Sequence, residues 1–188
     1  MKLLTLVLSS LLYSVLTLAQ TPSIEQIENS LNDTQWVGGA GIGKLRTGGP
    51  ALYIKAEMAF QVDNGHLYYL SSILGGLDKK IDSRAKGLCI NSPPREAQLV
   101  VSEDGKSIDG NVVLPDYNVE TGTHTYYTIP LKNLKIVDEK NLIFTSIPVN
   151  IKGNPINVRY KLSRKQSKTT DELAAQLKNC LIEKPWIK

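Results

Sequence analysis

The stretch ALYIKAEMAFQV, residues 51–62, alternates apolar and polar side chains along its whole length. In an extended chain, side chains two residues apart share one face. The first face carries Leu52, Ile54, Ala56, Met58, Phe60 and Val62, and the second carries Tyr53, Lys55, Glu57 and Gln61. This pattern is typical of an antiparallel strand with one face on the core and the other in water.

The same period of two recurs along the chain. Residues 155–163 alternate in the same way, and turn-forming residues such as Asp63-Asn64-Gly65 separate several strand-like runs. The other runs are Trp36–Leu45, Leu67–Ile73, Gly87–Ile90, Ala97–Ser102, Ser107–Leu114, Thr123–Ile136 and Leu142–Ile151. The sequence therefore predicts a mainly β fold, an antiparallel barrel or sandwich of about eight or nine strands. An open sheet with helices on one face is the alternative.

A short helix is expected at each end of this β region. Near the start, Thr21 at the cap, Pro22 at the first helical position and apolar residues at Ile24, Ile27 and Leu31 predict a helix that ends near Asn32. Near the end, Thr169 and Glu172 fit a capping box. The apolar stripe of this second helix consists of Leu173, Leu177, Cys180 and Leu181. Pro185 prevents the helix from continuing.

The first residues have the features of a leader. Lys2 precedes an uncharged, apolar run from Leu3 to Leu18, and small residues stand before the expected cleavage between Ala19 and Gln20. A retained membrane anchor is the alternative, but the run is shorter than the roughly 20 residues a spanning helix needs. We expect a signal peptide at 1–19, one β-rich domain at 20–188, a secreted or periplasmic location and no transmembrane segment after cleavage.

Export gives the two cysteines a structural interpretation. Cys89 and Cys180 are the only cysteines of the chain, and an oxidising compartment favours a disulfide between them. The bridge would staple the closing helix to the sheet. A C-x-x-C motif, which would point to metal or redox chemistry, is absent from the sequence.

Charge narrows the classes of partner. The formal net charge of +4 is too small to argue for nucleic acid, but six basic residues and no acid occupy the segment 151–170. They are Lys152, Arg159, Lys161, Arg164, Lys165 and Lys168. The interpretations are an ordinary solvated face or a landing patch for an acidic protein surface, a lipid headgroup or a polyanion.

Two short patterns offer candidate polar residues. His66 with Tyr68 and His124 with Tyr126 each share one strand face, so they would form a metal-binding or anion-binding cluster if their strands adjoined. The alternative is that they are ordinary strand-face residues, and we predict no metal and no cofactor. The glycine-rich run 38–43 leads into no helix, so close backbone approach explains it better than a phosphate loop.

The segment Asn32-Asp33-Thr34-Gln35-Trp36-Val37-Gly38, with the β-rich middle and closing helix, resembles the lipocalin-like (calycin) barrels. The chain departs from that family at Thr34, where the signature has glycine two residues before the tryptophan. It also has no clear strand after its last helix. The resemblance implies a barrel with a small apolar ligand inside, lying against Leu52, Ile54, Met58 and Phe60. Asn32 also begins a glycosylation sequon, which has meaning only in a eukaryotic host.

None of the common catalytic motifs occurs in the sequence. We therefore expect an exported, non-enzymatic β-rich binding protein that carries a small apolar ligand in a lipocalin-like barrel. The rival hypothesis is a protein-interaction module, of the envelope accessory or inhibitor type, that uses its basic residues. A third is an enzyme with dispersed residues such as His66, Asp109 and His124. The oligomeric state stays open.

Overall fold

The computed structural model describes residues 23–42, 52–73, 94–118, 120–150 and 152–183. The expected signal peptide at 1–19, its cleavage site, the expected strand Gly87–Ile90 and Cys89 lie outside these ranges. None of the helices within the described ranges has the length and apolarity needed to cross a membrane.

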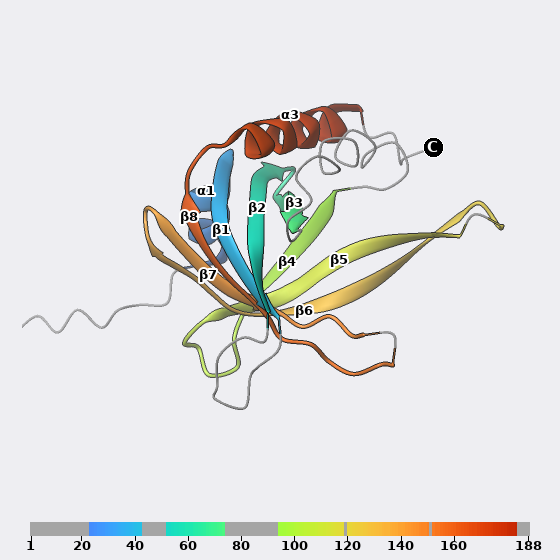
Figure 1. The fold of residues 1–188 in the computed structure, drawn as a ribbon, viewed down its shortest axis with the longest axis horizontal. Helices are drawn as coiled ribbons and strands as arrows, with labels where there is room; N and C mark the ends of the chain where they lie inside the picture. Colours follow the sequence, from blue (N-terminus) through green and yellow to red (C-terminus); the bar gives the residue numbers. More distant parts are fainter. Residues whose placement is uncertain (1–22, 43–51, 74–93, 119, 151, 184–188) are drawn as a thin grey trace, which may run out of the picture.

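The strands form a closed antiparallel barrel in which each strand pairs with the next and the last pairs with the first. Its strands are β1 (Thr34–Ile42), β2 (Leu52–Asp63), β3 (His66–Ile73), β4 (Arg95–Val101), β5 (Ile108–Asn118), β6 (Thr123–Asp138), β7 (Asn141–Ser146) and β8 (Val158–Arg164). This confirms the predicted mainly β class and selects the barrel over the sandwich and the open sheet (Figure 1).

The ends of β5 and β7 differ most from the prediction. β5 continues past the expected end at Leu114 to Asn118, because Pro115 lies opposite Tyr126 at a position where the ladder tolerates a residue without an N–H. β7 ends at Ser146, earlier than expected. Beyond it the Ile147 N–H donates to the Pro130 carbonyl at 2.8 Å, and Pro148 has no N–H to extend the ladder.

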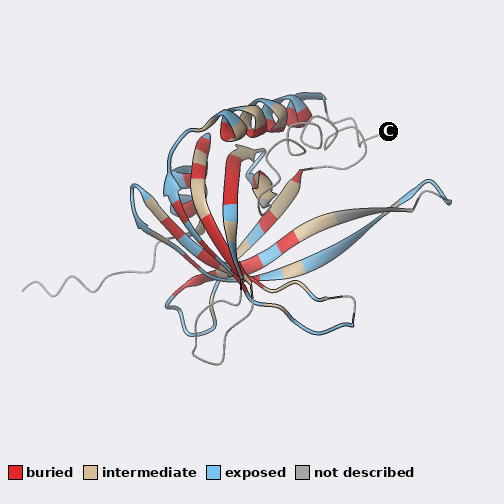
Figure 2. Cartoon of the chain, viewed as in Figure 1, coloured by how far each residue is buried: buried red, intermediate tan, exposed pale blue. Residues whose placement is uncertain are grey.

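The inward faces have the predicted period of two. Met58 and Phe60 are buried in the barrel interior with Trp36, Leu142 and Phe144, while Ile54 is half-buried against them. On β8, Val158, Tyr160 and Leu162 point inward, and the basic residues between them are exposed. Figure 2 shows this alternation of buried and exposed positions along the strands.

The two predicted helices are present, but each begins at a different cap. α1 (Ile24–Leu31) is capped by Ser23, whose hydroxyl accepts the Gln26 N–H while the Gln26 side chain accepts the Ser23 N–H. The N-cap of α1 is therefore Ser23, and the predicted cap at Thr21 is wrong. α3 (Lys168–Glu183) follows Ser167, whose hydroxyl accepts the Thr170 N–H at 3.1 Å, so the expected cap at Thr169 is also wrong.

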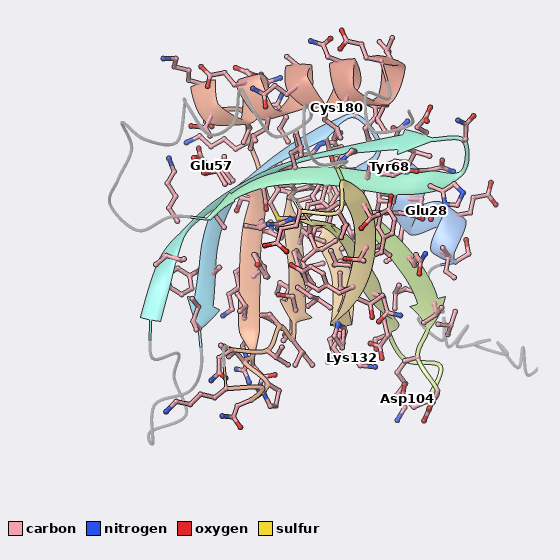
Figure 3. All side chains as sticks on the ribbon, turned by 90° about the vertical axis from the view of Figure 1, so that its right-hand side faces the viewer. Glu28, Glu57, Tyr68, Asp104, Lys132 and Cys180 are labelled. Atoms are coloured by element: carbon pink, nitrogen blue, oxygen red, sulfur yellow. The ribbon has the colours of Figure 1, made fainter. Side chains whose placement is uncertain are left out.

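α1 and α3 pack on different parts of the barrel. Ile27 and Leu31 of α1 belong to the interior cluster, so α1 covers one end. α3 lies outside, across β1, β2 and β3, where the predicted stripe on the helix packs against Ala59 and Leu70 (Figure 1). Cys180 is buried on that side of α3, and Glu57 lies beneath the helix, where it accepts the Ser167 hydroxyl at 2.7 Å (Figure 3).

Thr34 has a defined place at the point where the chain departs from the lipocalin signature. Its side chain is buried, and its hydroxyl donates to the Leu31 carbonyl at the end of α1. The same oxygen accepts the Trp36 indole N–H at 2.8 Å. A glycine could not make these two hydrogen bonds. The Thr34 hydroxyl therefore links the end of α1 to the buried Trp36 in a way that the lipocalin signature does not.

Candidate functional site

Arg95 is a half-buried arginine on the inward face of the barrel. It precedes Ala97 and Leu99 on the inward face of β4, and it pairs in register with Tyr69 of β3. The guanidinium lies 5.8 Å from the centre of the Tyr69 ring, and its Nη1 donates to the Ser71 hydroxyl at 2.8 Å. Among the described residues, no carboxylate pairs with Arg95.

Two tyrosines share this part of the interior. Burial raises the pKa of Tyr69 to about 12, against the opposing effects of the Arg95 charge and of a hydrogen bond with Arg95. Burial likewise raises the pKa of Tyr160, while a hydrogen bond with Ser146 and the Arg95 charge act to lower it. Both phenols therefore keep their protons at neutral pH and can donate hydrogen bonds. Tyr160 is held in place by stacking on Phe144, with ring centres 4.3 Å apart.

The interior on the α1 side of this cluster is filled. A gap there has room for about 10 Å³, close to the smallest space that holds one water molecule. Its walls include Leu31, Met58, Phe60, Ala97 and Leu99. Leu31 of α1 closes one side of the gap, and Ala97 and Leu99 of β4 line it. Arg95 comes two residues before Ala97 on the same strand face, so it lies on the side of the gap away from α1.

These residues form what we call the Arg95 cluster: Ser71, Tyr69, Arg95, Ser146 and Tyr160. A guanidinium has five N–H donors in a rigid fork that matches a carboxylate or phosphate. The described partners of Arg95 are hydroxyl groups and an aromatic ring. The cluster can therefore offer two hydrogen bonds from Arg95 and phenolic hydrogen bonds to one oxyanion, in surroundings that are largely apolar.

Three of the residues predicted to line a calyx have described side chains, and these contribute to the packed interior. Met58 and Phe60 are buried in the interior and Ile54 is half-buried, whereas the side chain of Leu52 lies outside the described set. They pack against one another and their neighbours, so on the α1 side they form core.

The two histidine–tyrosine pairs do not come together. His66 and Tyr68 are on β3, His124 and Tyr126 are on β6, and two strands separate β3 from β6. His66 instead lies 2.9 Å from Glu96 through its Nδ1, and Tyr126 is exposed. A shared site of these four residues is therefore excluded by the strand order.

The predicted basic residues are exposed, and two of them join a wider set on the outside of the barrel. Across five adjacent strands, the register aligns Lys135, Ile143, Lys161, Gly39 and Lys55 in one row, and Arg159 lies in the next row. We call Lys55, Lys135, Arg159 and Lys161 the basic face. Lys55 pairs with Glu57 at 3.1 Å. Lys152, Arg164, Lys165 and Lys168 are exposed outside these two rows.

An acidic hollow adjoins the basic face, because Lys132, which lines the hollow, lies in the same row as Arg159. An open hollow of about 380 Å³ is lined by Ser102, Glu103, Asp104, Ser107, Asp109, Lys132 and Asn133. Figure 3 labels Asp104 and Lys132. Burial alone would raise the pKa of Asp109, but Lys132 and the Asn133 N–H bond to the carboxylate and hold its pKa below the ordinary value. Lys132 therefore already neutralises this carboxylate. In the described part of the chain, no group of three or more His, Cys, Asp or Glu is placed to hold a metal.

The predicted disulfide stays a prediction. Cys180 is buried on the sheet side of α3, as expected, and the described part of the chain holds no free cysteine. The proposed partner, Cys89, lies outside the described residues.

Sequence reasoning missed the Arg95 cluster, although the chain contains a signal for it. The predicted strand began at Ala97, so Arg95 lay outside it. Extending the same alternation backwards by two residues puts Arg95 on the face of Ala97 and Leu99. A charged residue on an otherwise apolar strand face is a reason to suspect a site. Comparisons with protein-family models, with curated proteins and with solved structures found no match to this chain.

Proposed function

We propose that this chain is an exported, non-enzymatic binding protein whose barrel takes up a small organic anion at the Arg95 cluster. The observation that carries this proposal is an arginine on the inward face of the barrel with hydroxyls and a tyrosine ring as its described partners. Arg95 is half-buried, and a guanidinium that is partly shielded from water binds an anion more strongly than a fully solvated one does. The carboxylate of a ligand would form an ion pair with Arg95 and accept hydrogen bonds from the N–H groups of the guanidinium.

The packing on the α1 side of the Arg95 cluster limits how far a ligand can extend in that direction. The gap lined by Met58, Phe60 and their neighbours holds about 10 Å³, whereas binding sites for drug-sized molecules occupy roughly 300–1,000 Å³. A purely apolar carrier would need that space. An anion with a short apolar part would need little beyond the oxyanion position itself. The lipocalin-like resemblance is thus supported at the level of a closed barrel, and the proposed ligand differs from the apolar one first expected.

A matched pair of probes tests the proposal. We expect hexanoate to bind the purified protein in calorimetric titration and hexanol to bind at least about ten-fold more weakly, because only the carboxylate can pair with Arg95. Arg95→Gln should remove this preference. Arg159→Gln, which removes an arginine from the outside of the barrel, should leave it unchanged. Circular dichroism establishes that each variant is folded.

Several results would overturn the anion hypothesis. One is equal affinity for hexanoate and hexanol, and another is undiminished hexanoate binding by a folded Arg95→Gln variant. A third is the failure of hexanoate, hexanesulfonate and hexyl phosphate all to bind, since together they cover the common oxyanions.

The basic face supports a second candidate function, recognition of an acidic protein surface. Arg159, Lys161 and Lys135 are exposed and have no ion pair within the described ranges. The exposed Ile143 lies between Lys135 and Lys161, and Tyr53 is 57% exposed at the edge of the face. Exposed cations around an apolar centre are electrostatically complementary to an acidic protein surface.

Poly-L-glutamate serves as the probe for this second function. We expect binding that weakens as salt rises, because exposed charges are screened, and that weakens further in Lys161→Gln. Lys106→Gln removes the same charge from the β4–β5 turn and should have little effect. Equal losses in the two variants, or no binding of poly-L-glutamate at low salt, would rule the basic face out. Stronger binding of heparin or anionic vesicles would assign it to another class of partner.

A further inference from the structure

β5 and β6 extend beyond the barrel as a two-stranded arm. β4 pairs with β5 as far as Val113, and β7 pairs with β6 from Leu131 onward. Residues 114–118 and 123–130 therefore pair only with each other among the described strands. Figure 1 shows this hairpin projecting away from the other strands. Two-stranded hairpins are marginal when isolated, so an arm of this length calls for an explanation.

The direction of the backbone groups on β6 can be fixed from one hydrogen bond. The carbonyl of Pro130 accepts the Ile147 N–H at 2.8 Å, so it points away from β5. Backbone groups alternate with a period of two along a strand, and the β5–β6 register is regular from Asn111 to Asn118. The N–H and C=O groups of His124, Tyr126 and Thr128 therefore point to the outer edge of the arm.

The two edges of the arm differ in chemistry. On the β5 edge, Pro115 offers no N–H, and the next residue in the sequence is the acidic Asp116. Prolines and charges are the usual means by which proteins block an exposed edge. On the β6 edge, Thr123–Ile129 contains no charged residue, no proline and no glycine, and it consists mainly of β-branched and aromatic residues. Such a segment readily accepts another strand.

We propose that this β6 edge pairs with the β6 edge of a second copy of the chain. An antiparallel pair of identical strands has two-fold symmetry, the commonest symmetry of protein dimers. It brings each residue near its own copy, so a charged segment would repel itself, and the uncharged Thr123–Ile129 does not. This inference concerns assembly and does not depend on the proposed ligand.

The outward groups select one register. Pairing Tyr126 with Tyr126 of the second copy also brings His124 opposite Thr128 in both directions. All three outward residues then take part, with up to about six backbone hydrogen bonds. Tyr126 is 60% exposed, so the pairing would also cover aromatic surface of the kind that dominates interfaces.

A charge exchange at the symmetry axis tests the register. We expect the full-length protein to dimerise reversibly between low and high micromolar concentration in sedimentation velocity experiments, since so small an interface is weak. Tyr126→Lys and Tyr126→Glu should each dimerise roughly ten-fold more weakly, because like charges meet at the axis. An equimolar mixture of the two variants should recover the dimer.

Tyr127→Lys is the matched control. Its side chain lies on the other face of the arm and meets Thr125 of the second copy rather than itself, so it should dimerise nearly as the wild type does. In addition, Tyr126→Cys should form a cross-linked dimer on mild oxidation, and Thr128→Cys should not. A monomer at every concentration, no recovery in the mixture, or equal effects of Tyr126→Lys and Tyr127→Lys would each overturn the proposal.

Discussion

Gly38→Ala should destabilise the barrel by about 3 kcal/mol, a large effect for one methyl group. Gly38 lies in β1 between Ala56 of β2 and Leu162 of β8. A Cβ at this position would lie 2.1 Å from the Lys161 carbonyl oxygen and 2.8 Å from the Leu162 Cα. Both are backbone atoms of the strand that closes the barrel, so neither can move without loosening the β1–β8 ladder.

Gly39→Ala is the control for this prediction. The added Cβ would also be too close to its neighbours, at 2.0 Å from the Tyr53 Cε1 atom. Tyr53 is 57% exposed, so its ring can swing into solvent, and we expect a cost below about 1 kcal/mol. Urea unfolding followed by circular dichroism measures both. Similar losses in the two variants would show that the β1–β8 contact is not the source.

Gly38 also shows how far the sequence could predict the fold. Alternation such as that of residues 51–62 fixes which side chains face inward, and these assignments are confirmed at Met58 and Phe60. Alternation is the same in a sandwich and in a barrel, however, so closure could not be predicted. Closure depends on β1 meeting β8 at Gly38, a contact between residues more than a hundred positions apart that leaves no periodic signal.

The helix caps were misplaced for a different reason. Thr21, Ser23, Thr169 and Ser167 are all good cap residues, and two lie close together at each helix start. The choice between them depends on reciprocal bonds, those of Ser23 with Gln26 and of Ser167 with Thr170. The cap of α3 also depends on Glu57, which bonds Ser167 from β2 and lies far away in sequence.

The candidate site could be predicted in part. The mainly apolar interior was visible from the strand pattern, but the cluster around Arg95 joins β3, β4, β7 and β8, and its members are spread from Tyr69 to Tyr160. The proposed grouping of His66 with His124 needed adjacent strands, and a short shared pattern cannot report strand order. Only the position of Arg95 two residues before Ala97 was available as a signal.

Alkaline pH should destabilise the protein through Tyr69. The pKa of Tyr69 is raised to about 12, chiefly by burial, whereas an unfolded tyrosine has a pKa of roughly 10. Between these values the unfolded chain releases the phenolic proton and the folded chain keeps it. The unfolded state then binds fewer protons, so the free energy of unfolding falls as pH rises. The stabilisation is complete below about pH 10, and about 2–3 kcal/mol is lost by about pH 12.

Tyr69→Phe should therefore flatten the dependence of unfolding free energy on pH in this alkaline window. A smaller fall should remain, because burial also raises the pKa of Tyr160. Tyr53→Phe, at an exposed ring, should follow the wild-type profile. Urea unfolding at a series of pH values measures the profile, and tyrosinate absorbance follows the deprotonation itself. An undiminished fall in Tyr69→Phe would mean that the folded barrel holds the Tyr69 proton no more tightly than the unfolded chain does. Tyr69 would then still be protonated at neutral pH and remain a donor of the Arg95 cluster, but the burial of its hydroxyl group as the source of the raised pKa would be refuted.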